Sequence, residues 1–253
     1  ASIEELQVLD LSQNQITDLT PLSTQTGLTE CNVSDNQLQS LQGIETACSL
    51  TSLDVSGNAL TNLDECSQMI KLFTLKASDN QITDLEGIRN CTILERLELM
   101  NNQLTELSVL EGRLVDLTSL LISGNCVADL SPISASEKLE YLLARGNGIE
   151  SLEPLSSLNN LKCLDVDDNA LTSLAGLENK EQLLTLQAGN NQITDISALE
   201  SSADLLYLDL RSNQLTDISV LNWLNRTDGL YLCLEHNQIQ DFSPLPVEGA
   251  GMY

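Results

Sequence analysis

The feature that most constrains the fold is a series of asparagines repeated at nearly constant spacing. Eight of the ten intervals between them are 22 residues long, one is 23 and one is 24. The series consists of Asn14, Asn36, Asn58, Asn80, Asn102, Asn125, Asn147, Asn169, Asn191, Asn213 and Asn237. A unit of this size cannot bury its apolar face alone, so neighbouring units must stack into a solenoid. Because an amide side chain both donates and accepts hydrogen bonds, the series predicts a ladder that satisfies the backbone of successive turns.

Apolar residues keep fixed positions around each asparagine. In the first unit Leu9 and Leu11 precede Asn14, and two apolar positions separated by one residue predict a short strand with one buried face. Later in the unit apolar residues recur every third position, a spacing that suits a 3₁₀ turn. Proline begins this predicted turn in four units, where its missing N–H is not needed. These residues are Pro21, Pro132, Pro154 and Pro244.

The repeats predict one elongated domain over residues 1–253, with eleven repeats between residues 6 and 245. Extra residues around 111–116 and 222–228 lengthen two units outside the strand, so they are expected to bulge without disturbing the strand register. The chain starts at Ala1 without methionine, and residues 1–5 are too few to cap the first repeat. We expect a longer natural chain, with residues 246–253 as a truncated tail or a weak cap.

Charge and hydropathy narrow the class of partner. The chain has 37 acidic and 11 basic residues, a formal net charge of -26, which disfavours binding to nucleic acid and anionic lipid. This charge favours solubility or a protein partner with a basic patch. No apolar run reaches the length of about 18 residues that crosses a bilayer, so membrane insertion is not expected.

The seven cysteines do not behave as a disulfide framework. Adjacent repeats never carry cysteine at the same position, and a disulfide needs Cα atoms within about 7 Å. We therefore expect free thiols, which favour a reducing compartment. The sequence has no CxxC motif or His/Cys cluster, so neither a metal nor another cofactor is expected.

The pattern LxxLxLxxNxIxxLxxLxxL over Leu6–Leu245 resembles the leucine-rich repeat family, and within it the Sds22-like class. This class includes bacterial internalins and a eukaryotic regulator of phosphatase-1. The resemblance implies an α/β solenoid, a right-handed superhelix with a parallel β-sheet on its concave face and 3₁₀ turns on its convex face. Likeness to internalins implies a cell-surface or secreted protein, whereas the free cysteines favour the cytoplasm.

A binding surface is predicted on the concave face, where alternate strand side chains point away from the core. The first four repeats present small polar residues there, but the middle and the end of the chain present apolar, tyrosine and arginine side chains. Such composition is typical of interaction hot spots. The candidate residues are Arg96, Met100, Leu121, Tyr141, Leu143 and Arg145, followed by Tyr207, Arg211 and Tyr231. The alternative is that these side chains merely cover one another.

An acidic patch is predicted between the two groups. Asp165, Asp167, Asp168 and Asp209 would accept Lys or Arg side chains from a partner or, in a second interpretation, hold Ca²⁺.

Catalysis is not expected, because the chain has a single histidine and no Gly-rich phosphate loop. The sequence instead predicts an internalin-like module that recognises another protein, as a monomer or as part of a larger chain. Two alternatives stay open. One is an intracellular scaffold or a phosphatase regulatory subunit, and the other is a structural spacer domain of a larger surface protein.

Overall fold

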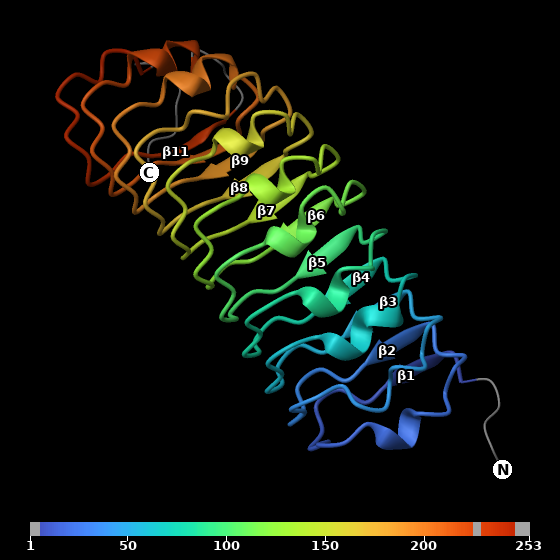
Figure 1. Cartoon of the computed structure of the whole chain (residues 1–253). Coiled ribbons are helices and arrows are strands. Elements are labelled where there is room, and N and C mark those ends of the chain that lie inside the picture. The colour runs from blue at the N-terminus through green and yellow to red at the C-terminus, as the bar shows by residue number, and fades with distance from the viewer. Residues whose placement is uncertain (1–5, 225–228, 246–253) are drawn as a thin grey trace.

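Eleven strands of three residues each form one parallel sheet in the order of the sequence (Figure 1). The computed structural model describes residues 6–224 and 229–245. The strands are β1 (Val8–Asp10), β2 (Glu30–Asn32), β3 (Ser52–Asp54), β4 (Thr74–Lys76), β5 (Arg96–Glu98), β6 (Ser119–Leu121), β7 (Tyr141–Leu143), β8 (Cys163–Asp165), β9 (Thr185–Gln187), β10 (Tyr207–Asp209) and β11 (Tyr231–Cys233). The predicted solenoid is confirmed, since each repeat adds one strand next to the previous one.

The central residue of each strand points into the core. Leu53 on β3 pairs with Leu75 on β4, and Leu75 pairs with Leu97 on β5. All three side chains are fully buried, while their strand neighbours on either side lie on the other face of the sheet. Stacking therefore extends one apolar column along the whole sheet.

The opposite, convex side of the coils carries short 3₁₀ helices, and no α-helix is present among the described residues (Figure 1). The 3₁₀ helices are η1 (Thr20–Leu22), η2 (Asp64–Gln68), η3 (Glu86–Ile88), η4 (Ser108–Leu110), η5 (Ser131–Ile133), η6 (Glu153–Leu155), η7 (Ser197–Ser201) and η8 (Ser219–Leu224). Proline occupies the first turn of η1, η5 and η6, as the sequence predicts. Pro244 instead lies in a hydrogen-bonded turn that is not part of a 3₁₀ helix.

Two further repeats depart from the predicted 3₁₀ turn. The second and the eighth repeats form single hydrogen-bonded turns at this position, where Gly43 has φ +112° and Gly176 has φ +102°. These angles lie far from the 3₁₀ region, which requires φ near -60°. The backbone of the preceding repeat also approaches closely, because a Cβ atom built on Gly176 would lie 2.2 Å from the carbonyl oxygen of Leu152.

The asparagines connect each repeat to the one before it. The Nδ2 atom of Asn102 donates to the carbonyl oxygens of Leu99 at 3.1 Å and, in the preceding repeat, of Ala77 at 2.9 Å. Its Oδ1 atom accepts the N–H of Ile82 at 2.9 Å. The residue before each ladder asparagine has positive φ in all eleven repeats, as Asn101 shows with φ 53°. This conformation turns the chain so that the amide faces the backbone.

The two lengthened repeats keep the strands in register, as predicted. Arg96 pairs with Ser119 across the first insertion, and Tyr207 pairs with Tyr231 across the second. The extra residues of the first insertion lie in the turn after η4, where Gly112 has φ +64°. Residues 225–228 of the second insertion, together with the termini 1–5 and 246–253, lie outside the described residues, and so does the expected C-terminal tail.

The core accepts polar groups at a few positions. Lys180 is fully buried, and its Nζ donates to the carbonyl oxygen of Ser156 at 2.7 Å and to Oδ1 of Asn159 at 3.3 Å. Desolvation lowers the pKa of this lysine.

All seven cysteines are free. Burial raises the pKa of Cys31 and of Cys91 to about 11, so both thiols stay protonated at neutral pH.

Candidate protein-binding surface

The concave face is formed by the first and third residues of each strand and by the residue two positions after the strand. The sequence predicts that all of these side chains reach solvent, but four of them do not. Ser78, Ser119, Asp167 and Asp209 are buried. Neighbouring strands lie only about 4.8 Å apart, so a short side chain is covered by longer neighbours in the same row. Ser119, for example, pairs with Arg96 on one side and Tyr141 on the other.

The first group of predicted residues gathers on β5, β6 and β7. Leu121 and Leu143 are a register pair, and both are half-buried rather than fully exposed. Met100 is half-buried as well, whereas Arg96, Arg145 and Tyr141 are exposed, the last with 45% of its surface. The predicted exposure of the two leucines is therefore wrong in degree, because the curved row lets the side chains shield one another. We call Met100, Leu121, Tyr141 and Leu143 the central apolar cluster.

The second group contains an aromatic pair. The rings of Tyr207 and Tyr231 stack with centroids 5.1 Å apart and an interplanar angle of 5°. Tyr207 is half-buried and Tyr231 is exposed. Desolvation, followed by the charge of Asp209, raises the pKa of Tyr207 to about 12, so its hydroxyl remains a hydrogen-bond donor at neutral pH.

The arginines of the two groups meet at Asp167. Its side chain is only 1% exposed, and its Oδ2 lies 4.0 Å from a guanidinium nitrogen of Arg145 and 4.0 Å from one of Arg211. Arg145 also contacts Asp168 at 2.7 Å, and Arg211 contacts Asp209 at 3.2 Å. Three of the four residues of the predicted acidic patch, Asp167, Asp168 and Asp209, thus lie within ion-pair distance of this chain's own arginines, a contact that was not predicted from the sequence.

Gly189 allows this contact. It stands between Asp167 and Arg211 in the same row, and its N–H donates to Oδ1 of Asp167 at 2.6 Å. A Cβ atom at Gly189 would lie 3.1 Å from Cγ of Arg211 and 3.3 Å from Oδ1 of Asp167. The missing side chain therefore gives both groups room to approach. The sequence signal was the recurrence of Arg145, Asp167, Gly189 and Arg211 at one position of successive repeats.

Burial sets the electrostatics of this network. Desolvation raises the pKa of Asp167 to about 6, against the opposing hydrogen bond from Gly189. The same cause raises the pKa of Asp165, whose Oδ1 accepts the N–H of Asp167 at 3.1 Å. The described residues contain no group of three or more His, Cys, Asp or Glu that could hold a metal ion.

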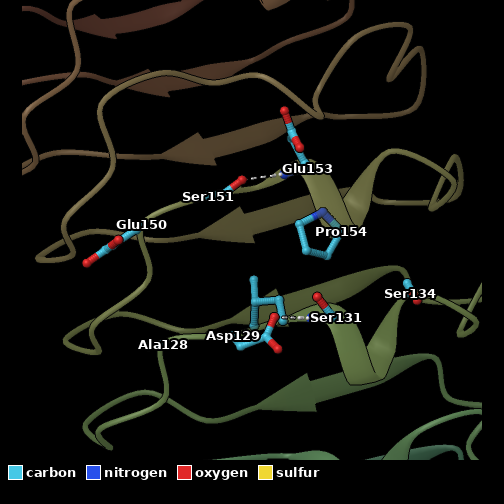
Figure 2. Close-up of a pocket in the computed structure, with 9 residues that line it drawn as sticks. Ala128, Asp129, Ser131, Ser134, Glu150, Ser151, Glu153 and Pro154 are labelled. Atoms are coloured by element: carbon cyan, nitrogen blue, oxygen red, sulfur yellow. Dashed lines mark hydrogen bonds between the residues drawn. The ribbon is translucent and has the colours of Figure 1, made fainter.

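A shallow groove of about 490 Å³ lies away from this face, between η5 and η6 (Figure 2). Asp129, Glu150 and Glu153 line it together with serines and Pro154. Its polar groups serve the local turns: Oδ1 of Asp129 accepts the N–H of Ser131 at 2.8 Å, and Oγ of Ser151 accepts the N–H of Glu153 at 3.2 Å. The groove therefore presents acidic charge without a built binding site.

Family models match the sequence over much of its length. A model described as "Leucine Rich repeats (2 copies)" matches residues 70–112, 137–179 and 181–223. Single-repeat models match residues 5–26 and 46–63. The chain belongs to the leucine-rich repeat family. Its place in the Sds22-like class of this family stays a prediction from the 22-residue spacing.

Solved leucine-rich repeat structures of bacterial origin have the same fold. An internalin (inlF) of Listeria monocytogenes is 29% identical with a TM-score of 0.88, over 94% of this chain and 77% of that chain. Internalin C2 of the same species is 31% identical with a TM-score of 0.68, over 70% of this chain and 77% of that chain. A leucine-rich repeat protein of Leptospira interrogans is 26% identical with a TM-score of 0.80, over 94% of this chain and 69% of that chain. These leucine-rich repeat proteins share the solenoid architecture described above.

No curated protein matches the chain in sequence. In the described part of this leucine-rich repeat chain, no helix has both the length and the hydrophobicity needed to traverse a membrane.

Proposed function

We propose that this chain is a non-enzymatic recognition module that binds another protein through its concave face. The observation that carries the proposal is the central apolar cluster, which places Tyr141 and Leu143 on the solvent side of the sheet beside Leu121. At the same positions β3 and β4 carry Ser52, Asp54, Thr74 and Lys76, so the fold does not require apolar residues there. The architecture shared with internalins supports a recognition role.

The geometry suits binding because the side chains are held at fixed spacing before a partner arrives. The strands from β2 to β10 are hydrogen-bonded on both sides within the sheet, so little backbone entropy remains to be lost on association. A half-shielded apolar centre with arginines at its edge is also typical of residues that dominate binding energy. In this proposal Arg96 and Arg145 form the edge, and Tyr207, Arg211 and Tyr231 extend the surface towards the C-terminal repeats. The partner would match the acidic chain with basic residues.

The test is the double variant Tyr141→Ala, Leu143→Ser. Its matched control is Thr74→Ala, Lys76→Ser, which changes the same two positions on β4. Both proteins would be used as baits in lysate and in culture medium, with captured proteins quantified by mass spectrometry. We expect at least one partner to be retained by wild type and control but lost by the β7 variant.

The folded state must survive for this result to be meaningful. Because the substituted side chains lie on the surface, we expect the free energy of unfolding to change by less than about 1 kcal/mol. If every captured protein binds the β7 variant as well as wild type, the central apolar cluster is not the binding surface.

A further inference from the structure

The residue immediately before each strand forms a row along one rim of the concave face. Except at Phe73, the N-terminal and middle repeats carry polar side chains in this row. The hydroxyls of Thr29, Thr51 and Thr118 donate to the carbonyl oxygen of the preceding repeat at 3.1, 3.0 and 2.9 Å. Glu140 and Lys162 form an ion pair at 2.8 Å in the same row.

The last three repeats change the character of this rim. They carry Leu184, Leu206 and Leu230 in place of the threonines and charges. Leu184 is 39% exposed and Leu206 is 52% exposed, and the two lie on adjacent repeats, since the N–H of Leu206 donates to the carbonyl oxygen of Leu184 at 2.8 Å. We call these three leucines, with the neighbouring exposed Tyr231, the apolar rim.

The fold itself does not call for leucine at this position. Threonine occupies it in three repeats with the same backbone hydrogen bonding and adds a side-chain hydrogen bond that leucine cannot make. Leu184 and Leu206, exposed in neighbouring repeats, and the half-buried Leu230 leave an apolar surface in water, and such surfaces mark interaction sites. The stacked Tyr207 and Tyr231 rings continue this surface onto the concave face.

Charge indicates what would cover the apolar rim. Residues 183–245 contain eight Asp and Glu but only two Arg and no Lys. The exposed Glu235 lies two residues after β11, the strand that carries Tyr231. A second copy of this chain would bring another net charge of -26 to the contact, which opposes self-association. A basic partner would instead be attracted.

We propose that the apolar rim docks a segment of a protein partner that carries an aliphatic or aromatic side chain next to Lys or Arg. The apolar side chain packs on Leu184 and Leu206, and the basic group is attracted by the net negative charge of the C-terminal repeats. This inference rests on the proposed recognition function and extends it from β5–β7 to the C-terminal repeats.

The experiment selects a random peptide library, displayed on phage, against the immobilised full chain. Representative enriched peptides are then synthesised, and their affinities are measured for wild type and variants. The diagnostic variant is Leu184→Thr, Leu206→Thr, because threonine is already accommodated at this position in the chain. Phe73→Thr is the matched control, since Phe73 is an exposed apolar residue at the same position whose neighbours in the row are Thr51 and Glu95.

We expect the enriched peptides to combine an apolar residue with Lys or Arg, and to bind Leu184→Thr, Leu206→Thr at least about tenfold more weakly than wild type. Their affinity for Phe73→Thr should stay unchanged. Versions with Glu in place of the basic residue should lose binding to wild type.

Other outcomes would overturn the inference in distinguishable ways. Peptides that are insensitive to the rim variant but lost with the β7 variant would support the proposed function and remove the rim from it. Peptides without basic residues would overturn the partner chemistry. Sedimentation that shows self-association of wild type, abolished by the rim variant, would assign the rim to a second copy. A failure to enrich any peptide would also reject the rim, while the β7 variant keeps its own test.

Discussion

At the scale of single residues, asparagine is required at the ladder position because one short side chain must donate twice or more and accept once. Asn102 donates to carbonyl oxygens of two repeats and accepts from the backbone of the earlier one. Aspartate would lack the donors, and glutamine would place the same groups one methylene further away. The constancy of asparagine in the sequence follows from this geometry.

Asn102→Ala is therefore expected to lower the free energy of unfolding by about 1 to 3 kcal/mol, because buried backbone groups lose their partners. Asn102 is 8% exposed. Asn14→Ala is the control, since Asn14 is exposed and, within residues 6–224 and 229–245, its amide donates only to Leu11 and Ser12 of its own repeat. Urea denaturation of both variants would measure the difference. Equal losses at the two sites would show that the bond to the preceding repeat contributes nothing.

At the scale of elements, the strands could be predicted but the convex turns only in part. A strand follows from apolar residues at alternate positions, and its register follows from the repeat length. Close approach of the previous repeat does not decide whether a convex segment forms a 3₁₀ helix. A carbonyl of the previous repeat crowds the Cβ position of Gly43, Gly176 and Gly87 alike, yet Gly43 and Gly176 lie in turns with positive φ, whereas Gly87 belongs to η3. Composition alone could not separate these cases.

Gly176→Ala should destabilise the protein by about 2 kcal/mol or more, since φ +102° and the carbonyl of Leu152 both oppose a Cβ atom. Gly112→Ala tests the contribution of φ alone. Gly112 has φ +64° and no atom within 4 Å of its Cβ position, so a loss of about 1 kcal/mol is expected. Both values come from urea denaturation. If Gly112→Ala lost more stability than Gly176→Ala, a small backbone shift must relieve the close approach of the Leu152 carbonyl to residue 176.

At the scale of the whole molecule, the sequence located the concave face, but it did not predict which side chains cover one another there. That depends on three or four repeats at once. Asp167 is buried because Arg145 and Arg211 reach towards it from either side, and Arg211 does so across a repeat that carries Gly189. Half-burial of Leu121 and Leu143 has the same origin. Such contacts can be recognised only when residues at the same position of successive repeats are compared.

The acidic balance of the molecule makes stability depend on pH. With a net charge of -26, protonation of carboxylates relieves repulsion in the folded state. Asp167 adds a specific contribution because its folded pKa is raised from 3.8 to about 6 by desolvation. Between these two values the folded state binds more protons than the unfolded state, so this group stabilises the fold as pH falls through the folded pKa. Above that pKa the contribution is lost.

We therefore expect the free energy of unfolding of wild type to rise as pH falls from about 7 to about 5, and to rise less in Asp167→Asn. The amide oxygen of asparagine can still accept the N–H of Gly189, which limits other changes. Asp18→Asn is the control. Hydrogen bonds from the backbone and side chain of Thr20 lower the pKa of Asp18, so its stabilising contribution is lost only below the unfolded value of 3.8, outside the tested range. Denaturation curves at several pH values would give the slope of the unfolding free energy against pH for each protein. An Asp167→Asn slope equal to that of wild type would show that Asp167 remains ionised, held by Arg145 and Arg211 despite its burial.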